Sequence, residues 1–344
     1  DPTEKWVLKE IKNLFYHIKY WYAFFKEHNI KINIDPSEHG QTTIIKQIAL
    51  KLLDACSVGK TRSYPTTQKG VFDNYYANDI FFTWGLDSAK RIDKTSNKVD
   101  NIIISGFPYI TNRQNNLLSN SIQKQFQNSN IKLRILLLDN VHSDENTSNR
   151  SLHKHNRLAQ VIETKELEKF YSSFFNWFLE DKEIGLIIKS KRNTIINSLP
   201  NLNNKLQEVI ETNRCHIVKK PFQILPSALT DVCDFAVSIN TFFPSSLVEC
   251  IIKNKRAVIY DYSGVFEDEQ NIKSWGIEKV IFRNIEQIIN SMKKFKKNPE
   301  LFSSIGNWSN FMKEFDPFND DLGGKRIGEY LKFLQENFNK KFSG

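Results

Sequence analysis

The sequence has no apolar run that approaches the roughly 18 residues needed to cross a membrane. Its start, "DPTEKWVLKE", lacks the pattern of a secretory signal peptide. The four cysteines match no zinc-ligand spacing and mostly have apolar neighbours; they are Cys56, Cys215, Cys233 and Cys250. We therefore expect buried free thiols in a reducing compartment.

Nucleic-acid motifs are missing as well. The net charge of +9 favours an anionic partner, such as a nucleotide, an acidic glycan or an anionic lipid. The basic residues are scattered, however, and no zinc finger, RNA-binding signature or basic zipper is present. We expect no nucleic-acid partner.

The chain does have the pattern of two α/β domains, which its 344 residues suit. Short apolar strands alternate with helices, as in a parallel sheet covered on both faces. We predict two Rossmann-like domains with a cleft between them, at 1–130 and 131–315. A C-terminal helix over 316–344 is expected to cross back to the first domain.

A long helix is predicted over residues 4–28. Apolar residues recur there at helical spacing with lysines between them, for example at Val7, Ile11 and Ile18. A basic, aromatic helix of this kind suits either a membrane surface or the flank of a sheet. We favour the flank of a sheet.

The stretch "FFPSSLVECI", residues 242–251, follows a buried strand and opens a helix. Ser245 and Ser246 lie at or beside its N-cap, and Pro244 fits its first turn. A helix N-terminus with hydroxyls suits a phosphate group. Glu249, one turn deeper, could accept hydrogen bonds from ribose hydroxyls. An ordinary serine cap would look the same.

Cations follow another strand of the same domain, in "LIIKSKRNT". Lys189, Lys191 and Arg192 come directly after the apolar run. In open parallel sheets, ligands bind at the carboxyl ends of strands. The three cations therefore become candidate ligands of a phosphate, although pairs of surface lysines are common.

Carboxylates occupy two further loops. Asp139 ends the strand of "LLLDNVHSDENTS" and Asp144 follows in the loop; either could serve as a nucleophile, a base or a turn former. Glu38 and His39 stand in "DPSEHGQTT", where a carboxylate could do acid/base work. Lys60, Arg62 and Ser63, in "GKTRSYPTT", are candidate ligands of an anionic acceptor.

The order of these motifs resembles that of GT-B glycosyltransferases of bacterial surface polysaccharide synthesis. Over about residues 30–265 the chain is most similar to the capsule and O-antigen transferases that use CMP-Kdo. "SEHG" resembles their acidic loop, "LLLDNVHSDENTS" their catalytic Asp segment, and "SINTFFPSSLVECI" their serine helix. Two departures stand out: "KSKR" lacks the usual His-Pro pair, and His39 replaces a second acid.

The resemblance implies a metal-independent transferase without cofactors that is cytoplasmic or peripherally associated with the inner membrane. Its donor would bind the C-terminal domain, through the cations and the serine helix together with Asn240 and Thr241. The acceptor, a glycan or lipid-linked oligosaccharide, would bind the N-terminal domain, including His39. Configuration would be retained through a sugar adduct on Asp139 or Asp144, with Asp139 favoured and Glu38 as acid/base.

Three alternatives stay open. Two are enzymes of the same architecture, namely a sialyltransferase and a CDP-alditol phosphotransferase. The third is a non-catalytic subunit that binds a nucleotide or glycan without turnover.

Overall fold

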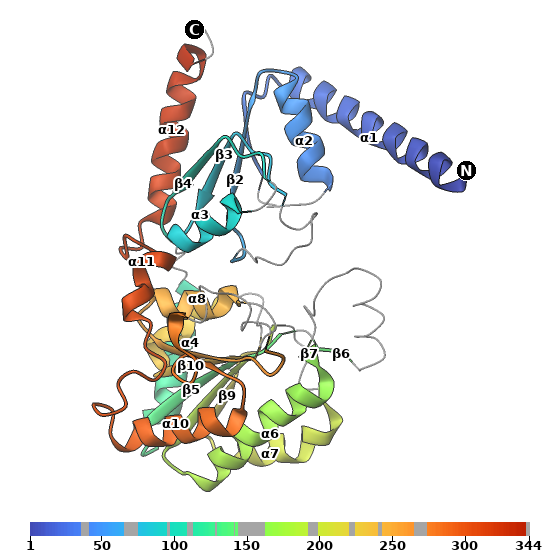
Figure 1. Ribbon diagram of the computed structural model, residues 1–344. Coiled ribbons are helices and arrows are strands. Elements are labelled where there is room, and N and C mark those ends of the chain that lie inside the picture. Colours follow the sequence, from blue (N-terminus) through green and yellow to red (C-terminus); the bar gives the residue numbers. More distant parts are fainter. Residues whose placement is uncertain are drawn as a thin grey trace. The chain divides into compact units, whose positions relative to one another are not determined.

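The computed structural model divides the chain into two compact units (Figure 1). The first comprises residues 1–110 and 313–344, and the second comprises residues 111–312. The structure describes residues 1–35, 41–64, 75–94, 97–108, 113–127, 129–140, 142–143, 162–191, 199–219, 224–239, 243–264 and 274–341.

The boundary between the units differs from the one predicted at residue 130. Helix α4 (Arg113–Gln127) belongs to the second unit, where it packs against the 3-10 helix η3 (Pro226–Val232). The hydroxyl of Ser119 donates a hydrogen bond to the carbonyl of Ala228 at 2.8 Å. Its many Asn and Gln residues make α4 resemble a linker in the sequence, whereas these contacts place it in the second unit.

The first unit is built on a four-stranded parallel sheet in which each strand lies beside the preceding one. The strands are β1 (Ile32–Asp35), β2 (Cys56–Lys60), β3 (Ile80–Thr83) and β4 (Asn101–Ile104). Helices α2 (Gln41–Lys51) and α3 (Leu86–Asp93) connect the first and last pairs. Because parallel crossovers are right-handed, a sheet that grows in one direction carries its connecting helices on one face. The opposite face needs another cover.

That cover is α12 (Gly323–Lys341), the last helix of the chain, which runs alongside the sheet in Figure 1. Its Leu334 and Phe338 are buried in one cluster with Phe82 of β3. Phe81, the neighbouring residue of β3, belongs to a separate cluster that includes α3. The two faces of the sheet are therefore covered by segments from opposite ends of the sequence.

Helix α1 (Pro2–Glu27) begins after Asp1, whose carboxylate accepts a hydrogen bond from the Thr3 N–H at 2.8 Å. Near its carboxyl end, Phe25 is buried in a cluster with Leu50 of α2. The helix therefore packs on another helix and not on the sheet. None of the described helices is both long and apolar enough to cross a membrane.

The second unit is built on a six-stranded parallel sheet. Its strands are β5 (Leu133–Leu138), β8 (Ile184–Lys189), β9 (Cys215–Ile217), β10 (Phe235–Ile239), β11 (Arg256–Tyr260) and β12 (Ile281–Phe282). In space they run β9-β8-β5-β10-β11-β12. Numbered along the chain this order is 3-2-1-4-5-6, that of a Rossmann fold, and the winding reverses between β5 and β10.

Helices complete the second unit, and Phe170, Phe174 and Phe178 of its longest helix are fully buried in the core beside the sheet. Besides α4 and η3, the described helices of the second unit are α6 (Thr164–Glu180), α7 (Asn203–Glu211), α8 (Ser245–Ile252), α10 (Ile285–Lys297), η2 (Pro200–Leu202) and η5 (Ser309–Phe311). Helix α11 (Met312–Phe315) lies almost wholly in the first unit. A separate strand pair joins β6 (His142–Ser143) to β7 (Ile162–Glu163).

The prediction of an α/β fold with two Rossmann-like domains is confirmed, and all four cysteines are buried free thiols as expected. Helix α2 ends at Lys51, and β2 follows at Cys56 without a strand pattern in its sequence. The strand "CSVGK" contains small and polar residues, so its sequence does not alternate or form an apolar run. Strands β9 and β12 also escape prediction because each has only 2 or 3 residues.

Candidate functional site

The candidate site lies in the second unit, at the carboxyl ends of β8, β5 and β10, which are neighbours in the sheet. The winding reversal between β5 and β10 is the point where ligands bind in sheets of this order. Asp139 follows β5 directly, Lys189 ends β8, and α8 follows β10. The fold thus brings together three of the motifs that the sequence singles out.

Asp139 has a buried carboxylate, and each of its two oxygens accepts a hydrogen bond from the protein. The Tyr171 hydroxyl of α6 donates to Oδ2 at 2.6 Å, and the Lys191 backbone N–H donates to Oδ1 at 2.6 Å. Burial raises the pKa of Asp139 to about 6, although the hydrogen bonds from Tyr171, Lys191 and Ser190 act in the opposite direction. This carboxylate joins the loop after β5 to the loop after β8.

A second link between these loops joins Asn140, the residue after Asp139, to the side chain of Lys191. The Lys191 ammonium donates a hydrogen bond to Oδ1 of Asn140 at 2.7 Å. Asn140 is buried, whereas Lys191 is exposed. The positive charge of Lys191 is therefore held at the edge of the sheet, within reach of solvent.

Lys189 and Glu249 form the charged centre of the site. Burial lowers the pKa of Lys189, while the negative charges of Glu249 and Asp139 partly oppose that shift. Burial also raises the pKa of Glu249 to about 7. Glu249 accepts a hydrogen bond from the backbone N–H of Ser227 at 3.2 Å, at the start of η3. One cation thus lies among two carboxyl groups whose ionisation is made costly by burial.

The amino end of α8 completes this edge. Pro244 is its N-cap, and Ser245 and Ser246 are the first two helical residues, so Pro244 stands one position earlier than the sequence predicts. Both serines are half-buried. Their position suits an anion, because the first backbone N–H groups of a helix point outward along its axis.

Several predicted site residues lie outside the described residues: Glu38, His39, Asp144, Arg192, Asn240 and Thr241. Tyr171, Asn140 and Ser227 are site residues that the sequence analysis did not single out. Asn140 could have been found, because it directly follows Asp139 at the strand end. Tyr171 gives no such signal, because it lies within an aromatic helix and 32 positions from its partner.

In the first unit, Lys60 ends β2, while Arg62 and Ser63 follow it. Arg62 is exposed, and Lys60 and Ser63 are half-buried. Beside them lies a buried polar group that the sequence did not indicate: the Tyr64 hydroxyl donates to the carboxylate of Asp87. The Arg91 Nε also donates to that carboxylate at 2.5 Å, so the loop after β2 is fastened to the start of α3.

The C-terminal segment also contributes to this edge of the first unit. The Asp316 carboxylate accepts a hydrogen bond from the Phe107 backbone N–H at 3.0 Å, just beyond β4. The Arg326 guanidinium donates to the carbonyl of Ser105 at 3.2 Å. The Phe315 ring packs on Tyr64 with 5.7 Å between centroids. The edge is therefore assembled from both ends of the chain.

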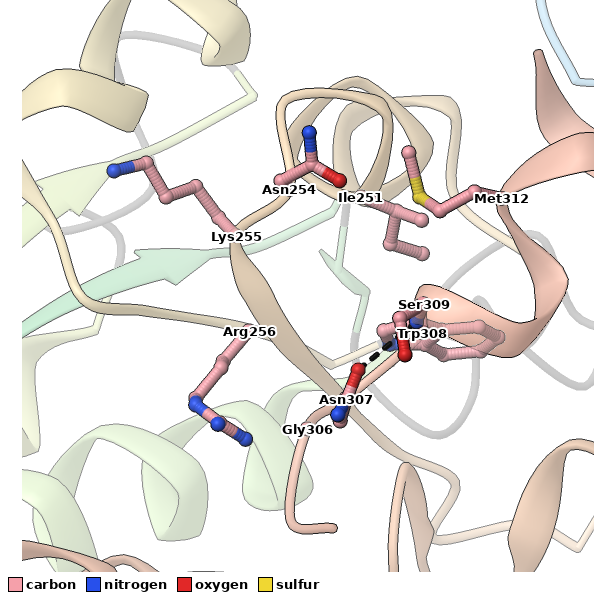
Figure 2. A pocket seen from close by; sticks show the side chains of 9 residues that line it. All are labelled: Ile251, Asn254, Lys255, Arg256, Gly306, Asn307, Trp308, Ser309 and Met312. Atoms are coloured by element: carbon pink, nitrogen blue, oxygen red, sulfur yellow. Dashed lines mark hydrogen bonds between the residues drawn. The ribbon is translucent and has the colours of Figure 1, made fainter. Parts of the chain in front are cut away.

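A pocket of about 170 Å³ lies elsewhere in the second unit (Figure 2). Arg256, the first residue of β11, lines it together with Trp308 and Ser309. The Trp308 indole N–H donates to the carbonyl of Ala257 at 2.7 Å. This pocket is at the amino end of β11, whereas ligands of Rossmann-like sheets bind at the carboxyl ends. We therefore do not assign the donor to it.

Comparison of the sequence with protein-family models finds no match, and neither does comparison with curated proteins. Solved structures do resemble the chain. A putative UDP-N-acetylglucosamine 2-epimerase from Listeria monocytogenes has a TM-score of 0.55 at 12% identity, covering 94% of this chain and 80% of that one. The fold is GT-B-like.

Two further structures agree with this assignment of the fold. MnaA from S. aureus, solved with UDP, has a TM-score of 0.54 at 12% identity and covers 94% of this chain and 81% of its own. HepE from Anabaena, also solved with UDP, has a TM-score of 0.50 at 11% identity and covers 92% and 82%. At such identities the likeness concerns the fold alone.

The raised pKa of Glu249 predicts a pH-dependent stability. Because its pKa rises from 4.5 in the unfolded chain to about 7 in the fold, its stabilising contribution is complete below about pH 4.5 and is lost as the pH rises through 7. Glu249→Gln keeps a carbonyl for Ser227 and cannot ionise. We expect it to be more stable than wild type by about 1–3 kcal/mol at about pH 8 and equal to it near pH 4.5. Urea denaturation at both pH values checks this, and a variant that is less stable at pH 8 would mean that Lys189 holds Glu249 ionised.

Proposed function

We propose that this chain is a glycosyltransferase that moves a sugar from a nucleotide donor, with CMP-Kdo the best candidate, onto a bacterial surface glycan. The observation that carries the proposal is the winding reversal in the second unit, where Lys189, Lys191 and the amino end of α8 meet. Cations and a helix N-terminus at that place suit the phosphate of a nucleotide. The GT-B-like fold supports the same assignment.

In this proposal, the second unit holds the donor. Ser245 and Ser246 bind the phosphate with their hydroxyls and backbone N–H groups, and Lys189 and Lys191 offset the charge that develops on the leaving nucleotide. The Glu249 carboxylate accepts a hydrogen bond from a ribose hydroxyl of the donor. Preformed cations and the helix terminus supply this stabilisation from the chain itself, so we expect no cofactor.

The geometry of Asp139 favours a positioning role over that of nucleophile. Both of its oxygens already accept hydrogen bonds, and the side chain is 6% exposed. A nucleophile needs a lone pair directed at the substrate. We therefore propose Asp144 as the nucleophile of a retaining double displacement and Glu38 as its acid/base. The acceptor would be held by the first unit through His39, Lys60, Arg62 and Ser63.

The decisive experiment is calorimetry with CMP, CDP and UDP, followed by a panel of nucleotide sugars with and without an acceptor glycan. We expect CMP to bind most tightly and its Kdo derivative to be consumed only with an acceptor. UDP is the first competitor, because the MnaA and HepE structures contain it. A sugar altered without acceptor would indicate an epimerase, and nucleotide binding without turnover would indicate a non-catalytic subunit. Consumption of CMP-sialic acid or CDP-alditol would indicate the corresponding transferase.

Removing both hydroxyls at the start of α8 should weaken nucleotide binding. We expect Ser245→Ala with Ser246→Ala to cost on the order of 2–3 kcal/mol, because hydrogen bonds to a charged group contribute about 1.5–3 each and do not add fully. Calorimetry with CMP measures the loss.

A matched serine pair provides the control. Ser303 and Ser304 are exposed and lie just before Gly306, whose carbonyl accepts a hydrogen bond from Ala257 near the amino end of β11. Their double alanine variant should bind CMP as wild type does. If the folded Ser245/Ser246 variant binds CMP as tightly as wild type, the phosphate does not bind at the start of α8.

A further inference from the structure

Between Trp6 and Tyr20, helix α1 exposes large apolar side chains to an unusual extent. The exposed fractions lie between 51% and 69% for Trp6, Leu8, Phe15, Tyr16 and Tyr20. A single exposed apolar residue needs no explanation, but a contiguous group on one helix does. Figure 1 shows this part of α1 extending past its contact with α2.

An apolar stripe also runs along α1, buried toward the carboxyl end of the helix and exposed toward its amino end. Val7, Ile11, Leu14, Ile18 and Phe25 follow one another at spacings of 4, 3, 4 and 7, which places them on one face. Phe25 is 2% exposed and Ile18 8%, whereas Ile11 is 42% and Val7 40% exposed. One face therefore packs within the protein at its carboxyl end and lacks comparable cover at its amino end.

A row of lysines borders this stripe. The spacings between them are 4, 3, 7 and 7, so they share one side of the helix: Lys5, Lys9, Lys12, Lys19 and Lys26. All five are exposed. The acids of the helix, Glu4, Glu10 and Glu27, have spacings of 6 and 17 and form no such row. An exposed apolar face with a row of lysines on a neighbouring side of the same helix suits the boundary between lipid headgroups and acyl chains.

We propose that the amino-terminal half of α1 lies on the surface of an anionic phospholipid membrane. The apolar stripe enters the boundary between headgroups and chains, and the lysine row contacts the lipid phosphates. Charge complementarity favours this occupant over a second copy of the chain, which would bring an identical row of positive charge. The inference does not rest on the proposed sugar transfer, because no residue of the donor site takes part in it.

The test is sedimentation of the full chain with vesicles of phosphatidylcholine, alone or mixed with phosphatidylglycerol. We expect binding to the mixed vesicles only, and weaker binding at high salt. Lys5→Gln, Lys9→Gln and Lys12→Gln together should reduce it on the order of 100-fold, at about fivefold per lysine. Ile11→Ser with Phe15→Ser should reduce it by a similar factor through the stripe.

The control variant removes the same charge elsewhere in the first unit: Lys51→Gln, Lys94→Gln and Lys98→Gln, all exposed. It should bind vesicles as wild type does, and CMP affinity should be equal in all variants. An equal loss of vesicle binding in the control would overturn the proposal, because the attraction to the membrane would then depend on the net charge of the protein and not on α1. So would equal binding to neutral vesicles, or a concentration-dependent dimer that Ile11→Ser with Phe15→Ser abolishes without any vesicle binding.

Discussion

Asp139→Ala is expected to destabilise the second unit by about 2–4 kcal/mol. The change leaves the buried Tyr171 hydroxyl and the Lys191 backbone N–H without their acceptor, and an unsatisfied buried donor costs about 1–3 kcal/mol. Relief of the desolvated charge offsets part of that cost. Urea denaturation followed by circular dichroism measures the difference.

Two companion variants separate a positioning role from a chemical one. Asp139→Asn keeps one carbonyl oxygen and should lose about half as much stability. Tyr171→Phe should cost about 1–2 kcal/mol, and its effect should not add fully to that of Asp139→Ala, because both remove the same hydrogen bond. If Asp139→Ala keeps wild-type stability yet abolishes transfer, Asp139 is the nucleophile and the positioning role is wrong.

The largest kinetic effect is expected for Asp144→Ala. If Asp144 forms the sugar adduct, its removal should slow transfer on the order of 1,000-fold or more, with nucleotide affinity unchanged, because a nucleophile stabilises the transition state and contributes little to the ground state. Intact-protein mass spectrometry after incubation with donor alone should show an added sugar mass in wild type and none in this variant.

Glu145→Ala, at the next position of the sequence, is the matched control and should keep both activity and adduct. Wild-type transfer by Asp144→Ala, or a product whose anomeric configuration is inverted relative to the donor, would exclude the double displacement. Glu38 would then be the candidate base of a single displacement.

Much of the second unit could be predicted because its central strands are continuous apolar runs. "ILLL" in β5 and "FAVSI" in β10, which Ser238 alone interrupts, are buried on both faces, and such runs are visible without knowledge of the partner strands. β2 shows the opposite case: Ser57 and Gly59 suit this strand because of tertiary contacts, such as the Ser57 hydroxyl donating to the Asp79 carboxylate at 2.8 Å. A beta-carbon on Gly59 would come within 2.6 Å of Phe81. Tertiary contacts of this kind leave no periodic pattern in the sequence.

The same distinction between sequence pattern and tertiary contact applies to the residues of the candidate site. Residues that directly follow a strand, such as Asp139, Lys189 and Ser245, are accessible to prediction because parallel strands bring their carboxyl ends to one edge. The role of Asp139 was not accessible, since it depends on Tyr171, which reaches the edge only when α6 packs on the sheet. A strand end predicts where a carboxylate lies but not whether its oxygens are already occupied.

The cover that α12 provides has a consequence for how the chain folds during synthesis. The first sheet is complete by Ile104, yet the residues that bury one of its faces, Leu334 and Phe338, leave the ribosome more than 200 residues later. The second unit is a contiguous segment and has all its strands and helices before then. We therefore expect the second unit to finish folding before the first, in contrast to the usual order in which the amino-terminal domain folds first. Until translation reaches α12, the first sheet lacks the helix that buries this apolar face in the complete chain.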